Sequence, residues 1–275
     1  MQKRCDYVII WLKGGWNMSE RLMKKFGSGN FYLLAFLVAF ALFILLQVFV
    51  MQGVLGYYEN KYPGFIRDFQ KAISNMNTKP ELMTEPMWAV QNLSQFIGTG
   101  ILAILMIIVF WKSFALDWKG FKSEWRSHVP TIIFGFVIVI ILDNVLAQLY
   151  NLFQVPGDAT NQKLIESAVE SSTGIFMVLS VFLLAPFVEE VLFRKLLYGT
   201  MEEKFRLRPV FAIIISAILF AAMHAVDIFF FRYLPLALVL CIAYSLSKNN
   251  IFVPMGIHFL NNSTIIIFFI KTVLK

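Results

Sequence analysis

Seven long apolar runs dominate the chain after a polar and basic beginning. They lie at about 31–51, 91–111, 131–152, 175–199, 209–225, 233–247 and 253–272. A helix needs about 20 residues to cross the hydrocarbon core of a bilayer, and most of these runs are near that length, the sixth being the shortest. Backbone groups in lipid must be hydrogen-bonded within their own segment, so the runs are predicted to be helices. The pattern predicts an all-α, polytopic transmembrane helix bundle of about seven spans, within a range of six to eight.

The segments between the runs suggest how the chain is organised. Residues 1–30 form a basic N-terminal segment, and residues 31–275 form a single membrane domain. Within that domain, 52–87 is predicted to be an outer loop with a short interfacial helix, and 175–272 is the core that carries the motifs described below. Segments on the N-terminal side of the membrane hold twice as many Lys and Arg residues as those on the other side. The positive-inside rule therefore places the N-terminus in the cytoplasm.

The composition agrees with a membrane location. Of the 275 residues, 59% are apolar and only 15% are charged, whereas soluble domains have about 25% charged residues. The formal net charge of +7 raises the question of nucleic acid. However, the basic residues are spread over short segments between apolar runs, without an aromatic platform for bases. We therefore expect a multi-pass protein of the plasma membrane whose surroundings are the lipid bilayer, and no nucleic-acid partner.

The stretch APFVEEVLFRKLLYG, residues 185–199, places charges inside an apolar run. Each charge at the centre of a bilayer costs about 2.5–3.5 kcal/mol on insertion scales, so such residues are usually functional. Glu190 and Arg194 are four residues apart and share a helix face, which predicts an ion pair. Glu189 points about 100° away and has no cation at that spacing. Such a carboxylate takes up a proton more readily than one in water, which suits a general base. Alternatively, both glutamates only pair with basic residues on other helices.

Two histidines lie in other apolar runs. His224 follows Phe220 by one helical turn, and Asn262 follows His258 by the same spacing. A single histidine in a membrane helix more often hydrogen-bonds between helices, but these groups together form a set. Imidazole shuttles protons or binds metal, a carboxylate takes a proton from water, and an amide stabilises an oxyanion. This set suits the hydrolysis of an amide. His128, in a basic linker, is expected to be solvated.

A polar stripe follows one face of the third run. Asn144, Gln148 and Asn151 are spaced i, i+4, i+7, and Asp143 lies beside them. The stripe is expected either to line the substrate cavity or to hydrogen-bond to a neighbouring helix.

Three motifs in this order resemble those of the CAAX protease and bacteriocin-processing family. This is the Abi family of intramembrane proteases, which includes the type II CAAX prenyl endopeptidases. The motifs are EExxxR (Glu189, Glu190, Arg194), FxxxH (Phe220, His224) and HxxxN (His258, Asn262). They span about residues 185–264, and the first three apolar runs show no such signature.

The resemblance implies a helical bundle with a buried cavity in which a peptide bond is cut. In this family Glu189 with His224 would activate water, and His258 with Asn262 would hold the oxyanion. The residues that would support the site are Glu190, Arg194 and Phe220.

The site residues allow two hypotheses about a cofactor. Glu189, His224 and His258 match a zinc ligand set, although the chain has no HExxH. A Glu189 bound to metal could not also be a free base. The metal-independent mechanism is therefore the working hypothesis, with zinc held by these three residues as the alternative.

The predicted function is that of an intramembrane endopeptidase in a bacterial plasma membrane. Its substrate would be a small peptide precursor or another membrane protein. The main alternative is a non-catalytic scaffold or regulator that uses the same fold and binds a membrane-protein partner. A proton- or ion-coupled transporter would also bury Glu and His, but it would usually show paired halves, which this sequence lacks.

Overall fold

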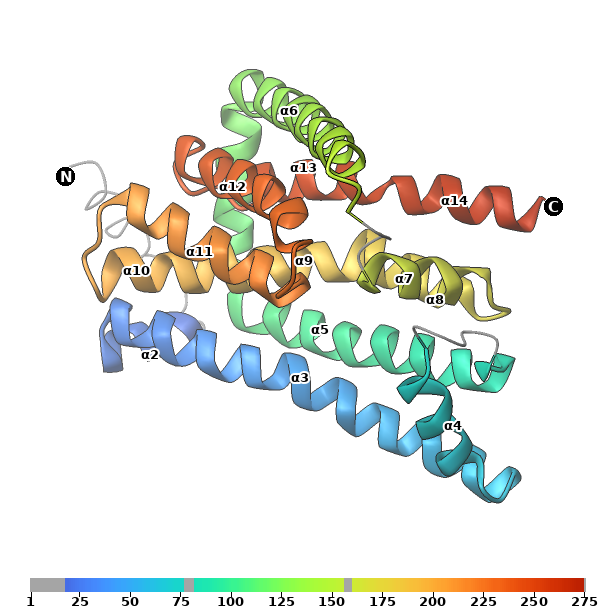
Figure 1. Cartoon of the computed structure of the whole chain (residues 1–275). Coiled ribbons are helices and arrows are strands. Elements are labelled where there is room, and N and C mark those ends of the chain that lie inside the picture. The colour runs from blue at the N-terminus through green and yellow to red at the C-terminus, as the bar shows by residue number, and fades with distance from the viewer. Residues whose placement is uncertain (1–17, 77–81, 156–159, 275) are drawn as a thin grey trace.

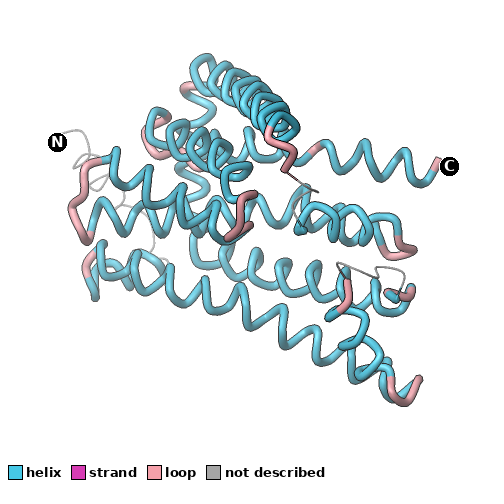
Figure 2. The backbone as a smooth tube through the Cα atoms, viewed as in Figure 1, coloured by secondary structure: helices cyan, strands magenta, loops and turns pink. Residues whose placement is uncertain are grey.

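The computed structural model describes residues 18–76, 82–155 and 160–274, and every regular element in these residues is a helix (Figure 1, Figure 2). Five helical segments are long and apolar enough to cross a membrane, and two shorter apolar helices, α11 (Pro209–His224) and α12 (Phe230–Leu246), join them. The five are α3 (Ser28–Lys61), α5 (Glu85–Ser123), α6 (Trp125–Leu152), Gly174–Glu203 and Phe252–Val273. The predicted all-α membrane bundle is confirmed.

Helix boundaries differ most in the segment predicted to be an outer loop, 52–87. α3 continues to Lys61, and α5 begins at Glu85. The short helix expected there is α4 (Phe65–Ser74), whose buried Phe65, Phe69 and Ala72 recur at helical spacing. These side chains pack with α3 and α5 in a second apolar core, so the segment is mostly helical.

Two further features were not expected from the apolar pattern. A short helix, α7 (Thr160–Glu170), precedes the fourth run, and the last run is divided at Ser263 into α13 (Phe252–Asn262) and α14 (Thr264–Val273). α14 packs against α7 and α8 in the second apolar core and leads to the C-terminal end (Figure 1). α7 is polar and short, which explains why a search for apolar runs does not find it.

The charged stretch lies in the best-shielded helical segment, Gly174–Glu203. Half of its most apolar window is buried within the protein, against 6% for α3. The segment is a succession of α8 (Gly174–Leu179), η3 (Ser180–Leu184), α9 (Ala185–Glu190), η4 (Val191–Tyr198) and α10 (Gly199–Glu203). η3 and η4 are π-helices, which are wound more widely than α-helices. Such segments are rare in proteins, and many of those that occur lie at functional sites.

The main apolar core surrounds this segment. Side chains of η4 pack against α3, α5, α11 and α12. The buried residues of this core include Phe31, Leu102, Met106, Val191, Leu192, Phe193, Leu196, Phe220, Ala237 and Cys241. The neighbouring helices therefore exclude lipid from both glutamates of α9.

The first turn of α3 approaches α10 very closely. A Cβ atom at Gly29 would lie 2.7 Å from the Cα of Lys204, a distance that real Cβ atoms do not show. The Ser28 hydroxyl donates to Glu203, and the Lys204 ammonium donates to the Asn30 side-chain oxygen. Glycine at position 29 thus permits a backbone contact that fixes α3 against the end of the central helix.

This contact predicts a difference between two glycines of α3. Gly29→Ala should lower the thermal midpoint of the purified protein by several degrees, because overpacking against backbone costs about 1–3 kcal/mol. Gly53→Ala is the matched control, since a Cβ there meets nothing within 4 Å and alanine favours a helix. A thermal unfolding series monitored by size-exclusion chromatography would measure both. Equal midpoints for the two variants would contradict the close approach.

Candidate active site

Glu190, the last residue of α9, is at the centre of a buried charge network. The Nε atom of Arg194 lies 3.2 Å from Oε2 of Glu190, and neither side chain is exposed. The Nδ1 atom of His258 lies 2.8 Å from Oε1 of the same carboxylate. The predicted ion pair is therefore present, and His258 joins it from α13.

Arg194 is held by more than this carboxylate. Its Nη2 atom donates to the Ala237 carbonyl of α12 at 3.4 Å, and its guanidinium lies 4.5 Å from the centre of the Phe220 ring. A desolvated cation over an aromatic face is stabilised by the ring's quadrupole. Arg194 thus connects the central helix with α11 and α12.

Glu189 faces the two histidines. Its Oε2 atom lies 3.8 Å from Nε2 of His224 and 3.8 Å from Nε2 of His258. The His224 side chain is 17% exposed and the His258 side chain 3%, so His224 is the more accessible of the two. The structure brings Glu189, His224 and His258 together from three helices that are far apart in the sequence.

Hydrogen bonds at the other ring nitrogens orient both imidazoles. Nδ1 of His224 lies 2.9 Å from the Phe220 carbonyl, which can only accept, so this nitrogen carries a proton. Nδ1 of His258 lies 2.8 Å from the Glu190 carboxylate that pairs with Arg194, and a carboxylate accepts, so this nitrogen likewise donates. In the neutral histidines, each Nε2 lone pair is therefore directed at the space beside Glu189. Three acceptor atoms converge there, which suits a donor such as water.

Aromatic rings support the His224 imidazole. Its centre lies 4.5 Å from that of Phe220 and 4.9 Å from that of Tyr233, with interplanar angles near 30°. Tyr233 was missed in the sequence because it begins the sixth run among other aromatic residues and belongs to none of the motifs. Only the packing of α12 against α11 distinguishes it.

Asn262, which the resemblance makes an oxyanion ligand, is hydrogen-bonded to backbone in this structure. Its Nδ2 atom donates to the Val181 carbonyl in η3 at 2.8 Å. In a π-helix this carbonyl would pair with the N–H of residue 186, which is Pro186 and has none. The N–H of Ala185 is used by Ser180. Asn262 therefore supplies the donor that the proline lacks. Within the described residues, it is not hydrogen-bonded to Glu189, His224 or His258.

The second π-helix also receives side-chain donors. The Ser216 hydroxyl of α11 donates to the Phe193 carbonyl, and the Thr200 hydroxyl donates to the Leu196 carbonyl. Irregular backbone in a membrane is tolerated where neighbouring groups satisfy it. Polar side chains thus hydrogen-bond to carbonyls of both π-helices that flank α9.

The remaining cation of the charged stretch, Lys195, pairs outside this group. Its Nζ atom lies 2.8 Å from the Asp117 carboxylate of α5 and 5.6 Å from the centre of the Phe114 ring. Asn250, between α12 and α13, donates to the Asp117 carbonyl at 2.7 Å. This pair joins three segments and is a structural contact.

Two expectations about polar residues are not met. His128 was predicted to be solvated, but it is 4% exposed and its ring stacks on Phe121 at 5.3 Å, because α6 folds back on the end of α5.

In the polar stripe, Asn144 is exposed and donates to a carbonyl of its own helix, and Gln148 and Asn151 are exposed as well. These three side chains face away from the neighbouring helices, whereas Asp143 beside them pairs with Arg232 of α12 at 3.4 Å, so the expected contact between helices is present only there.

A zinc ion held by Glu189, His224 and His258 would require shorter distances between their ligand atoms than the structure shows. Two atoms bound to one tetrahedral zinc at about 2.0–2.1 Å lie about 3.3 Å apart, whereas the distances here are 3.8 Å. Among the described residues, no group of three His, Cys, Asp or Glu side chains is arranged to hold a metal ion. The donor atoms are of the right kind, but this arrangement does not fit a zinc ion.

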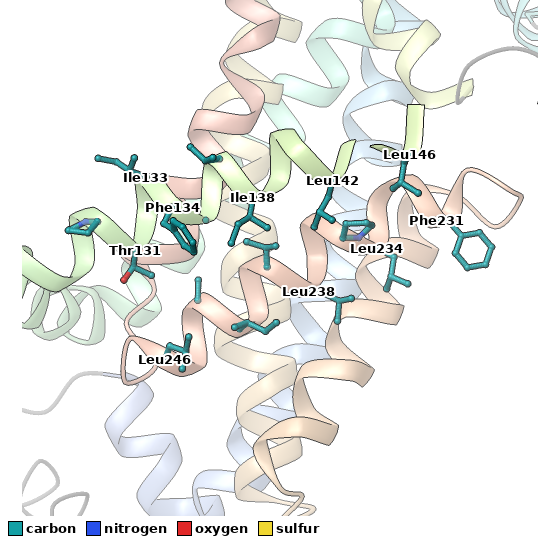
Figure 3. Close-up of a pocket in the computed structure, with 17 residues that line it drawn as sticks. Thr131, Ile133, Phe134, Ile138, Leu142, Leu146, Phe231, Leu234, Leu238 and Leu246 are labelled. Carbon is teal, nitrogen blue, oxygen red and sulfur yellow. The ribbon is translucent and has the colours of Figure 1, made fainter. Parts of the chain in front are cut away.

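A large apolar groove lies next to the site, between α6 and α12 (Figure 3). Its volume is about 1170 Å³, and Thr131 is the one hydroxyl-bearing residue among its lining side chains. Phe231, Leu234 and Leu238 line it from α12. At 100° per residue, Tyr233 and Ala237 are on roughly the opposite face of that helix. α12 therefore separates the groove from the charge network.

The fold and this geometry define a polytopic membrane protein with carboxylates and histidines gathered inside its helices. A family model described as type II CAAX prenyl endopeptidase Rce1-like matches residues 171–264. The predicted resemblance is thereby confirmed, and the motif-bearing part of the chain is similar to the endopeptidases that this model describes.

Two relatives extend the similarity. The membrane-embedded CAAX protease MroQ of Staphylococcus aureus strain USA300 is 30% identical over 155 residues, which cover 54% of this chain and 60% of that protein. YdiL of Bacillus subtilis strain 168, described as a candidate membrane peptidase, is 25% identical over 187 residues, 68% of this chain and 72% of that protein. No solved structure matches the chain.

The charge network predicts a stability effect. Arg194→Ala should strongly lower the amount of folded protein in membranes, because removing one partner of a buried pair costs about 3–5 kcal/mol. Arg232→Ala is the matched control, since Arg232 pairs with Asp143 in a partly exposed contact worth about 0–1 kcal/mol. Quantitative immunoblotting of membranes, followed by chromatography in detergent, would compare them. An Arg194→Ala protein that is as abundant as the control would refute the importance of the pair.

Proposed function

We propose that this protein is an intramembrane endopeptidase that hydrolyses a peptide bond with water activated by Glu189 and His224. The observation that supports it best is the convergence of Glu189 Oε2 with the Nε2 atoms of His224 and His258. The relatives named as a membrane-embedded protease and a candidate peptidase support the same reaction class.

In the proposed reaction, water lies between Glu189 and the two imidazoles. Glu189 takes a proton from this water while its oxygen attacks the carbonyl carbon of the peptide bond. The proton then passes to the leaving nitrogen, directly or through His224. The peptide bond breaks, and one carboxyl and one amino product form. His224 is the more accessible group and suits the proton transfer.

His258 is proposed to stabilise the developing oxyanion. When its Nε2 carries a proton, this N–H becomes a donor toward the same space. The contact of Nδ1 with Glu190 at 2.8 Å holds the ring so that Nε2 faces this space. Glu190, Arg194 and Phe220 would then act by holding the two histidines in place.

The proposed substrate is a small peptide precursor or a membrane-protein segment. The apolar groove on the other face of α12 is consistent with a substrate that is at least partly in lipid. We place the N-terminus in the cytoplasm of a bacterial cell and the protein in its plasma membrane. Basic residues at the end of the bundle formed by α2 (Met18–Phe26) and the bacterial relatives support this placement.

Replacement of the proposed base should separate chemistry from folding. Glu189→Gln keeps size and polarity, so we expect normal membrane levels and complete loss of cleavage; His224→Ala should also abolish it. The experiment compares membranes and medium of wild-type and Glu189→Gln cells by mass spectrometry of peptide termini. A peptide that matures only with wild-type protein would identify the substrate.

The same comparison distinguishes the alternatives. If deletion of the protein changes the cell but Glu189→Gln does not, the chain acts as a scaffold and the peptidase proposal is wrong. Once a substrate is known, cleavage by the purified protein should be unchanged by a zinc chelator. Loss of cleavage that added zinc restores would instead favour a metal held by Glu189, His224 and His258.

Asn262 is proposed to act by positioning η3, and a double substitution tests this. Asn262→Ala leaves the Val181 carbonyl without its donor, which should lower thermal stability and activity together. Pro186→Ala restores an N–H at the position that can serve this carbonyl. The double variant should therefore regain stability and part of the activity. If Asn262 instead binds the oxyanion, Pro186→Ala would restore neither.

A further inference from the structure

The polar stripe of α6 belongs to a longer seam along the exposed side of that helix. The residues of the seam follow one another at alternating spacings of three and four, as in a heptad repeat, and all of them are exposed. They are Phe134, Val137, Ile141, Asn144, Gln148 and Asn151. The first half of the seam is apolar and the second half consists of amides. Phe134 and Val137 also form one rim of the groove beside α12.

The seam lies opposite the face by which α6 packs into the bundle. The buried residues of α6 are His128, Gly135 and Val139, and Gly135 lies directly against the Ile257 side chain of α13. At 100° per residue, Asn144 is about 180° from Gly135. α6 packs against α12 and α13 at the edge of the bundle, and only 11% of its most apolar window is buried (Figure 1). The seam therefore faces the membrane.

Two contacts fix the rotation of α6 along its amide-bearing half. Asp143 pairs with Arg232 of α12 at 3.4 Å, and the Tyr150 hydroxyl donates to the Ile228 carbonyl at 2.9 Å. Asp143 and Tyr150 are seven residues apart, so they lie on one face of the helix. With this face held against α12 and the loop before it, the amides stay directed outward.

The amides of the seam lie at the depth of the hydrocarbon. About 20 residues counted from Val129, the first apolar residue of the span, extend to near residue 149. Asn144 and Gln148 fall within this length, and Asn151 is at its boundary. Among the described residues, the side chains of Gln148 and Asn151 make no hydrogen bond, and Asn144 donates only to the Ile140 carbonyl of its own helix. Amides without partners in hydrocarbon are unfavourable, so this face requires a partner that forms hydrogen bonds.

We propose that the seam binds α6 of a second copy of this chain, with the two helices parallel about a twofold axis perpendicular to the membrane. A side-chain amide both donates and accepts, so two identical amides satisfy each other. A twofold axis brings each seam residue opposite its equivalent, and two copies with the same orientation in the membrane have their amides at the same depths.

The rest of the seam agrees with this partner. The heptad spacing keeps the seam facing the second helix along its length, and none of the six residues is charged, so equal copies do not repel each other. Hydrogen bonds between side-chain amides stabilise helix pairs in membranes, whereas a lipid chain would leave the amides unpaired. The pairing is independent of the reaction at Glu189, because the seam faces away from the candidate active site.

The strength of the pairing can be measured in vesicles of phosphatidylethanolamine and phosphatidylglycerol. Single-molecule photobleaching of the labelled full-length protein at several protein densities gives the dissociation constant of the dimer. We expect wild-type molecules that bleach in two steps to become more frequent with density. Asn144→Leu/Gln148→Leu/Asn151→Leu should raise this constant on the order of 30-fold, at roughly threefold per hydrogen bond between helices. Leucine suits a lipid-facing position, so the amount of folded protein should not change.

Gln52→Leu is the matched control for the loss of an amide. Gln52 is exposed on α3, and its side chain makes no hydrogen bond among the described residues. Its replacement should leave the dissociation constant unchanged, because α3 is outside the proposed interface.

Site-specific photo-cross-linking in native membranes identifies the partner. Benzoylphenylalanine in place of Ile141, on the seam, should form an adduct with a second copy of the chain. Benzoylphenylalanine in place of Ile104 of α5 should not, although the two isoleucines are similarly exposed, at 55% and 59%.

Four results would overturn the proposal. A wild-type protein that stays monomeric at every density would exclude the pairing. Equal weakening by Gln52→Leu and by the triple variant would remove the seam from the interface, as would equal self-adducts from positions 104 and 141. An adduct at position 141 with a different membrane protein, and none with a second copy, would assign the seam to another partner.

Discussion

The arrangement of the site depends on a buried carboxylate that has two partners. Glu190 binds Arg194 through one oxygen and His258 through the other, with no exposure to lipid or water. An isolated charge at this depth would be very unfavourable, so the pair and the histidine must form together. They bring α9, η4 and α13 into one register. That register directs the His258 ring toward Glu189, whose printed partners among the described residues are His224 and His258.

Much of the site and of the fold could be predicted from the spacing of residues in the sequence. The i,i+4 relation predicted the Glu190–Arg194 pair, and the 100° offset predicted that Glu189 would face other groups. The apolar runs predicted the membrane helices, because burial in lipid requires long apolar segments. The contact of His258 with Glu190 could not be predicted, since it depends on how α13 packs against α9. The burial of His128 depends on tertiary packing in the same way.

The π-helices explain the largest difference between motif and structure. Asn262 belongs to a motif that implies an oxyanion ligand, yet its amide serves the Val181 carbonyl. No local pattern in the sequence predicts η3, and without η3 the missing N–H of Pro186 has no visible consequence. At η4, Ser216 donates to the Phe193 carbonyl from α11, and Thr200 donates to the Leu196 carbonyl, which also accepts from the N–H of Gly199. Polar donors thus lie beside the wider winding on both sides of α9.

These donors link the chemistry of the site to its position in the central helix. A π-helix has more residues per turn than an α-helix, so each one changes the direction in which the following side chains point. Glu189 and Glu190 lie in the short α-helical part between two such segments. Their division, one toward Arg194 and one toward His224, is thus sensitive to the winding on either side. If Asn262 maintains the winding of η3, there is a structural reason for its position one turn after His258. That single turn of α13 would then orient the His258 imidazole and, through η3, keep Glu189 and Glu190 directed toward this imidazole.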